Sequence, residues 1–123
     1  MPVNIEWYDE SQGIALYRML GRWTVDEALT SLDKIIRLAS VSPIYYIVDL
    51  TESLGVPSNL FTSSRLVASH LKLREGLTLV LGANPVAYVF LTSLVKLGVL
   101  YNLHFVSSYE EAEDAIRKHQ QSQ

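Results

Sequence analysis

Polar side chains that could take part in chemistry follow two apolar runs of this sequence. The runs cover residues 44–50 and 77–82, and the polar residues at or after their ends are Asp49, Thr51, Glu52, Ser53, Ser58, Asn59 and Asn84. In open α/β sheets, binding sites form at the carboxyl ends of the strands, where loops and helix N-termini converge. A helix N-terminus presents unpaired N–H groups and partial positive charge, which suits a phosphate or another anion. These residues, called the strand-end residues below, therefore form the candidate edge for binding a partner or a ligand.

The same residues also have a purely structural interpretation. Asp49 and Thr51 can close the end of a strand, and Ser58 can cap the following helix, which contributes about 1 kcal/mol. N-cap serines are common and require no activity, so spacing alone favours this structural interpretation. The segment from Thr51 to Ser58 is first a strand-to-helix connection, and second the best candidate for a contact surface.

The sequence holds no residue set typical of catalysis or metal binding. His70, His104 and His119 are far apart, without another His or a carboxylate at ligand spacing, and the chain has no Cys. No glycine-rich phosphate loop and no G-x-S-x-G motif occurs. The acidic pairs at 26–27 and 110–111 fall in predicted first helical turns, where the helix dipole accounts for them. We predict no catalytic residue, no metal site and no cofactor, and we expect that the protein is not an enzyme.

Length and composition indicate a single domain. The chain has 123 residues, of which 49% are hydrophobic, which is enough to bury one core. Its net charge is -3 and its Lys and Arg residues are scattered, which argues against nucleic acid or an anionic membrane as the main partner. The N-terminus has no basic region followed by an apolar stretch, so we expect no secretory signal and a cytoplasmic location.

One apolar stretch, residues 85–106, has about the length of a membrane span. Lys96 lies near its middle, and a central Lys costs roughly 2.5–3.5 kcal/mol on insertion. Gly98 interrupts the stretch, and His104 lies near its end. We predict a buried helix followed by a buried strand here, and no membrane span.

The N-terminal part predicts a β-hairpin and a helix. Alternating apolar residues at 3–8 and an apolar run at 14–20 form the hairpin, with Gly13 supplying a positive φ in the turn. A helix then begins after Thr24, because Thr24 and Glu27 have the spacing of a capping box. Apolar residues at intervals of three and four continue this helix to Ala39.

The remainder predicts three strands that alternate with helices. Strands at 44–50 and 77–82 are continuously apolar, as strands covered on both faces are, and a short strand covers 102–106. Helices are predicted at 59–74, from Pro85 to Gly98 after an N-cap at Asn84, and after Ser108, which forms a second capping box with Glu111. The order ββαβαβαβα predicts one α/β domain over residues 1–118, with a mixed, mostly parallel sheet and flanking helices. A disordered C-terminal tail is expected at 119–123.

The predicted third helix is apolar around more than one face, which is typical of a helix that is buried on both sides. The rest of the fold or a second subunit must then cover it. We predict a homodimer through this helix, with a face formed by Tyr88, Leu91, Val95 and Tyr101.

The element order and the C-terminal half resemble the STAS domain of anti-sigma-factor antagonists. In that family a strand leads to an N-capped helix with an L…LG ending, and a short strand then leads to a Ser-opened EEA helix. The matching residues here are Asn84, Leu94, Leu97, Gly98, Phe105, Ser108, Glu110, Glu111 and Ala112. IVDLT at 47–51 is similar to the family's strand with its terminal Asp. The resemblance covers nearly the whole chain, mostly at architectural positions.

The resemblance implies a non-enzymatic regulatory module that binds a protein partner, such as a kinase-like anti-sigma factor. The family's regulatory residue is a Ser at the start of the second helix, usually in an Asp-Ser-Ser-Gly-like turn. This chain reads VPSNL at that place, and Ser58 is the closest positional match. Ser58 is therefore the candidate phosphoacceptor.

A small-ligand site at the same edge, for an anion, a nucleotide or a lipid, is the alternative function. It rests on the topology of the strand ends alone. For a lipid, a chain of this length leaves little room for a cavity of several hundred Å³ beside a normal core.

Overall fold

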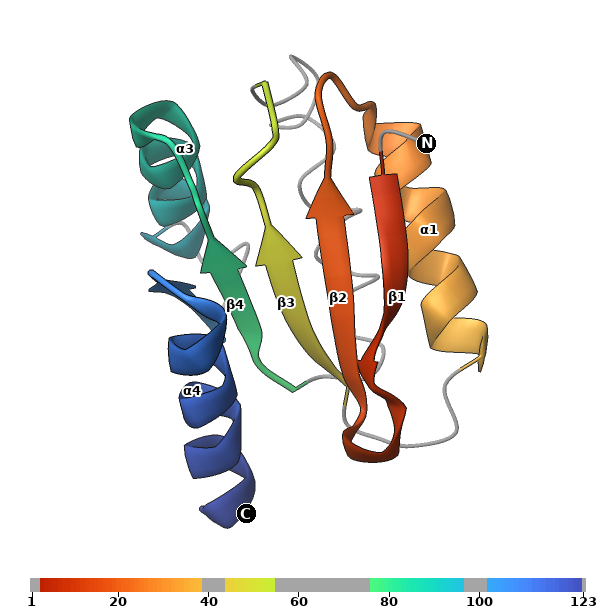
Figure 1. Ribbon diagram of the computed structural model, residues 1–123. Helices are drawn as coiled ribbons and strands as arrows, with labels where there is room; N and C mark the ends of the chain where they lie inside the picture. The colour runs from red at the N-terminus through yellow and green to blue at the C-terminus, as the bar shows by residue number, and fades with distance from the viewer. Residues whose placement is uncertain (1–2, 39–43, 55–75, 97–101, 123) are drawn as a thin grey trace.

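A computed structural model of the chain describes residues 3–38, 44–54, 76–96 and 102–122 (Figure 1). In chain order its elements are β1 (Val3–Asp9), the short 3₁₀ turn η1 (Glu10–Gln12), β2 (Ile14–Met19), α1 (Val25–Leu38), β3 (Tyr45–Asp49), β4 (Thr78–Leu81), α3 (Pro85–Lys96), β5 (Leu103–Val106) and α4 (Tyr109–Gln121). The helix predicted at 59–74 lies outside the described residues, as do the end of α3 at Gly98 and the segment 39–43.

The strands form one five-stranded sheet in the order β1-β2-β3-β4-β5. β1 and β2 pair antiparallel, because the hairpin turn closes at Gly13, whose φ of 69° is in the left-handed region that glycine adopts without strain. The pairs β2–β3, β3–β4 and β4–β5 are parallel. The predicted mixed, mostly parallel sheet of an α/β fold is thus confirmed, and the carboxyl ends of β2 to β5 meet at one edge.

Helices pack on both faces of this sheet. Alternate residues of β3 separate the two faces, since Tyr46 belongs to one buried cluster while Tyr45 and Ile47 belong to the other. The first cluster contains Ala28 and Ile35 of α1 and Ala87 of α3, and the second contains Ala112 and Ile116 of α4. Figure 1 shows α1 on the β1 side of the sheet, and α3 and α4 on the β4 side. Because β3 is covered on both faces, its sequence is apolar without alternation.

The predicted capping boxes set the starts of α1 and α4. At α1, the Thr24 N–H donates to Glu27 Oε1 at 3.0 Å and the Glu27 N–H donates to Thr24 Oγ1 at 3.1 Å, as the spacing predicts. At α4, the Glu111 N–H donates to Ser108 Oγ at 3.1 Å. Glu111 Oε2, however, accepts from the Ser107 N–H at 2.7 Å instead of from that of Ser108. The box is therefore one residue wider than predicted.

The C-terminal helix is longer than the sequence suggests. α4 continues to Gln121, so residues 119–121 of the expected disordered tail are helical. A hydrogen bond of 3.0 Å joins the Tyr45 hydroxyl and His119 Nδ1, and Gln120 Nε2 donates to Gln12 Oε1 at 3.2 Å. These contacts connect the last turn of α4 to the start of β3 and to the hairpin turn. They stabilise the helical conformation of residues that the polar tail sequence alone predicts to be disordered. Within the described ranges, no helix is both long and apolar enough to cross a membrane.

Candidate functional site

The strand-end residues that the structure describes are Asp49, Thr51, Glu52, Ser53 and Asn84. Asp49 is the last residue of β3, and the others lie in the segments that follow β3 and β4. The Leu50 N–H donates to the Leu81 carbonyl at 2.8 Å, which holds these two segments side by side. Ser58 and Asn59 lie outside the described residues. The structure therefore describes five of the seven residues of the predicted edge.

Asp49 is the buried polar residue at the centre of this edge. Its side chain is only 7% exposed. One carboxylate oxygen, Oδ1, accepts from the Thr51 N–H at 2.9 Å and from the Thr51 hydroxyl at 2.6 Å. The other oxygen, Oδ2, accepts from the Tyr109 hydroxyl, at the first residue of α4. Asp49 thus joins β3, the following loop and α4. These hydrogen bonds also offset the free-energy cost of burying a carboxylate.

These contacts set the pKa values of the pair. Burial alone would raise the pKa of Asp49, but the hydrogen bonds from Thr51 and Tyr109 and the positive charge of Arg18 outweigh burial and lower it. Burial, together with the hydrogen bond to the Asp49 carboxylate and its charge, raises the pKa of Tyr109 to about 12. Tyr109 therefore acts as a neutral donor to a charged acceptor, which is a strong type of hydrogen bond.

Tyr109 also connects α4 to the edge strand β1. Its ring stacks on that of Tyr8, with ring centroids 6.0 Å apart and planes 3° from parallel. The Tyr8 hydroxyl donates to Glu113 Oε1 at 2.5 Å, and this hydrogen bond, then burial and the charge of Glu113, raise the pKa of Tyr8. Sequence reasoning missed Tyr109, because nothing local marks a residue just after an N-cap as the partner of an acid 60 positions earlier.

Arg18 is the second residue of this edge that sequence reasoning missed. It lies opposite Asp49 in the parallel register of β2 and β3. Its Nη2 forms an ion pair of 3.1 Å with Glu52 Oε2, and both side chains are partly solvent-exposed. The signal that could have identified it is its charge, because Arg18 is the single charged residue in the apolar run 14–20.

The loop after β3 is fixed to the end of β2. The Gly21 N–H donates to the Glu52 carbonyl at 2.8 Å, and the Leu54 N–H donates to the Gly21 carbonyl at 2.9 Å. The Trp23 indole N–H donates to Ser53 Oγ at 3.0 Å. Held in this way, Leu54 is 75% exposed. An apolar side chain therefore projects to solvent from a loop whose backbone is fixed.

The segment after β4 approaches this loop closely at Gly82. A Cβ at Gly82 would lie 2.4 Å from Thr51 Cγ2 and 2.8 Å from the Thr51 backbone nitrogen. Gly82 also has a φ of +76°, so both space and conformation require glycine. Two residues later, Asn84 Oδ1 accepts from the Ala87 N–H at 2.8 Å, which confirms Asn84 as the N-cap of α3.

The four residues of the predicted dimer face of α3 differ in their exposure. Tyr88 is 49% and Val95 is 37% exposed, whereas Leu91 is partly buried and packs against the core. Tyr101 lies outside the described residues. Val86 and Val89, which the prediction omitted, are the most exposed of the apolar side chains that the structure describes in this helix, at 71% and 63%. The helix is thus covered by the sheet on one side, and its other apolar side faces solvent.

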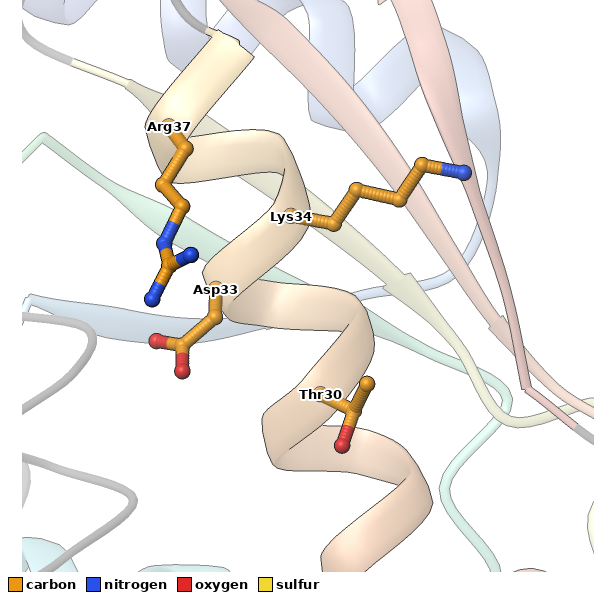
Figure 2. A pocket seen from close by; sticks show the side chains of 4 residues that line it. All are labelled: Thr30, Asp33, Lys34 and Arg37. Carbon is orange, nitrogen blue, oxygen red and sulfur yellow. The ribbon is translucent and has the colours of Figure 1, made fainter.

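An open hollow of about 450 Å³ borders the outer face of α1, and the lining residues are Thr30, Asp33, Lys34 and Arg37. Figure 2 shows the Arg37 and Asp33 side chains on one side of the helix and Lys34 pointing away from both, so the charged groups do not converge on one point. Since a ligand site needs polar groups that converge, this hollow offers no candidate site. Across the described part of the chain, no three His, Asp or Glu side chains are grouped so that they could hold a metal ion.

Comparison with known proteins supports the fold. The sequence matches no protein-family model and no curated protein. Among solved structures, the chain is similar to an uncharacterised protein of the DUF3478 family from Shewanella loihica, which is described as having a SpoIIAA-like fold. The TM-score is 0.64 at 15% sequence identity, and the match covers 93% of this chain and 91% of that one. The predicted STAS-like α/β fold is thereby confirmed.

Proposed function

We propose that this protein is a non-enzymatic regulatory module that binds a protein partner through the loop after β3. The observation that carries the proposal is that the polar side chains at this edge are paired within the chain, while the apolar side chain of Leu54 beside them is exposed. Asp49, Ser53 and Asn84 make hydrogen bonds within the chain, and Glu52 is paired with Arg18. Leu54 beside them is 75% exposed on a loop fixed by backbone hydrogen bonds.

This arrangement suits a protein surface better than a small ligand. A small-ligand site depends on a few polar groups that point at the ligand, and the described polar groups of this edge already serve the fold. A protein partner instead needs a preorganised apolar anchor with charges at its rim. Leu54 supplies the anchor, and the partly exposed pair of Arg18 and Glu52 supplies the charges. Because backbone hydrogen bonds already fix residues 52–54, little further entropy of these residues is lost on binding.

The SpoIIAA-like fold and the resemblance to anti-sigma-factor antagonists support a kinase-like anti-sigma factor as the partner. Ser58 follows Leu54 by four positions in the sequence. A phosphate on Ser58 would add about −1.5 to −2 charge close in sequence to the anchor, and a partner packed there would be repelled or lose desolvated contacts. Binding would then be switched without a change of fold.

The proposal is tested by comparing partner binding among matched variants. Tagged protein is incubated with extract of the source organism, and retained proteins are quantified by mass spectrometry for the wild type, Leu54→Asp, Ser58→Asp, Ser58→Ala and Thr30→Asp. Thr30 is exposed on α1 and serves as the matched surface control. We expect a specific partner to be retained by the wild type, Ser58→Ala and Thr30→Asp, and lost by Leu54→Asp and Ser58→Asp. The partner is then purified and its affinity measured directly, with at least a tenfold loss, or about 1.4 kcal/mol, expected for Leu54→Asp.

Equal retention by Leu54→Asp and the wild type would contradict the docking surface. Equal retention by Ser58→Asp and Ser58→Ala would contradict the switch. A thermal-shift screen with nucleotides and inorganic phosphate distinguishes the small-ligand alternative, since a true ligand raises the unfolding midpoint by linkage. A midpoint that rises with one of these compounds, without a specific protein partner, would replace the proposed function.

A further inference from the structure

Arg22 is an exposed cation that the fold holds beside the loop carrying Leu54. The residue before it, Gly21, forms a parallel β-bridge with Ser53, and the Gly21 carbonyl accepts from the Leu54 N–H at 2.9 Å. The residue after it, Trp23, is buried, and its indole N–H donates to Ser53 Oγ at 3.0 Å. Both chain neighbours of Arg22 are thus bonded to that loop, so the backbone of Arg22 has a fixed position next to Leu54.

The charge of Arg22 is not used within the described part of the fold. Across the described ranges, its side chain forms no ion pair and no hydrogen bond. Two acids of the neighbouring segments are already engaged. Glu52 pairs with Arg18 at 3.1 Å, and Glu27 Oε1 accepts from the N–H and the hydroxyl of Thr24 at 3.0 and 2.9 Å. Arg22 therefore offers a guanidinium group that a partner can bind without breaking a contact of this chain.

Asp26 is another exposed charge near this end of α1. It lies in the first turn of the helix, where the unpaired N–H groups and the helix dipole stabilise a carboxylate. Arg22 precedes the helix and has no comparable stabilisation within the chain. Of these two charges, Arg22 is the one that gains more from a counter-ion.

We propose that the protein partner presents an acidic side chain to Arg22, next to the apolar surface that receives Leu54; this inference rests on the proposed function. A guanidinium group can bind a carboxylate through two parallel hydrogen bonds, which fix the orientation of the partner as well as its charge. Arginine is also enriched among the residues that dominate the energetics of interfaces. Arg22 and Leu54 then form a charged and an apolar anchor side by side.

Other kinds of partner surface fit this position less well. A basic surface would face Arg22 as a like charge, and it would reach Glu52 only in competition with Arg18. An uncharged surface that covers Arg22 would leave a desolvated cation unpaired. The net charge of the chain is -3, so an acidic partner is repelled by most of the molecule and is directed to this position. Charge complementarity thus favours an acidic partner surface.

Charge reversal at Arg22 tests the inference with the partner that the extract experiment identifies. The variants are Arg22→Glu, Arg22→Met, which keeps an apolar stem without the charge, and Arg37→Glu. Arg37 is an exposed arginine in the last turn of α1 and serves as the matched control. We expect Kd to rise about threefold or more for Arg22→Met and at least about tenfold for Arg22→Glu, and to stay unchanged for Arg37→Glu.

Two further measurements distinguish a direct ion pair from a change in the loop. Raising the salt concentration should weaken wild-type binding more than binding by Arg22→Met, because salt screens the ion pair. Replacing the acids of the partner one at a time by Arg should restore the binding of Arg22→Glu at one position. Binding by Arg22→Glu that equals or exceeds that of the wild type, or no restoration at any acid of the partner, would overturn the inference.

The inference and the proposed function can fail separately. Loss of binding by Leu54→Asp, with Arg22→Glu binding like the wild type, would contradict the acidic contact and leave the docking loop intact. If no protein is retained in a way that depends on Leu54, the proposed function fails, and the inference about Arg22 fails with it.

Discussion

Gly82 and Gly21 occupy similar backbone conformations at the strand-end edge but have different surroundings. Their φ values are +76° and +58°, so any other residue is strained at both positions. A Cβ at Gly82 would also overlap Thr51, at 2.4 Å from its Cγ2 and 2.9 Å from its Cα, whereas nothing lies within 4 Å of a Cβ at Gly21. Comparing substitutions at Gly21 and Gly82 therefore distinguishes the free-energy cost of the left-handed backbone conformation from that of steric overlap.

We expect Gly82→Ala to be the more destabilising of the two substitutions. Gly21→Ala should lower the free energy of unfolding by about 1–2 kcal/mol, which is the cost of the left-handed conformation alone. Gly82→Ala adds steric overlap with backbone atoms that cannot rotate away, so we expect a loss of about 3 kcal/mol or more. Urea denaturation of both variants measures the difference. Similar losses would mean that Gly82 does not approach Thr51 closely.

At the scale of helices and strands, the sequence predicts those features that are determined by residues close together in the chain. The hairpin, the Thr24 box and the Asn84 cap follow from residue types at fixed local spacings, and the structure has all three. The element order then places the residues after β3 and β4 at one edge of the sheet. Local chemistry thus accounts for most of the fold and for the position of the candidate site.

Contacts between distant segments are what the sequence does not predict. Asp49 is recognisable as the end of a strand, but its partners Tyr109 and Arg18 depend on how α4 packs and on the register of β2 with β3. The same holds for the end of α4, where the polar tail sequence predicts disorder and contact with Tyr45 provides order. The exposed side of α3 is a similar case, because an apolar helix gives no sign of which side meets the sheet.

The last turn of α4 allows a test of whether a contact between distant segments orders residues that the local sequence predicts to be disordered. His119 Nδ1 lies 3.0 Å from the Tyr45 hydroxyl, and the two rings meet edge to face at 5.5 Å. We expect His119→Ala to lower the free energy of unfolding by about 1 kcal/mol, because a hydrogen bond and an aromatic contact are lost. Gln121→Ala is the control in the same helix, and its effect should stay within about 0.5 kcal/mol. If both variants matched the wild type in urea denaturation, residues from 119 onward would behave as the disordered tail that the sequence suggests.

For the molecule as a whole, Asp49 is the point where the sheet, the loop after β3 and α4 are joined. Its carboxylate accepts hydrogen bonds from Thr51 in that loop and from Tyr109 in α4. Since the pKa of Asp49 is lowered in the folded protein, the folded state binds the proton at this position less readily than the unfolded chain does. The stabilisation by Asp49 is therefore fully present above its unfolded pKa of about 3.9, and it is lost as the pH falls through the lower folded value.

Replacing Asp49 with Asn should thus change stability in a pH-dependent way. At pH 7 we expect Asp49→Asn to lower the free energy of unfolding by about 2–3 kcal/mol, because hydrogen bonds to a charged acceptor are weakened. Below about pH 4 the unfolded wild-type chain begins to bind the proton at Asp49, so the difference between the two proteins should narrow as the pH falls further towards the lower folded pKa. Urea denaturation from neutral to acidic pH measures the difference, with Asp26→Asn as an exposed acid-to-amide control that should cost less than about 1 kcal/mol. A difference between the wild type and Asp49→Asn that stays constant with pH would show that the Asp49 charge does not couple protonation to folding, and that shape alone holds α4 against the sheet.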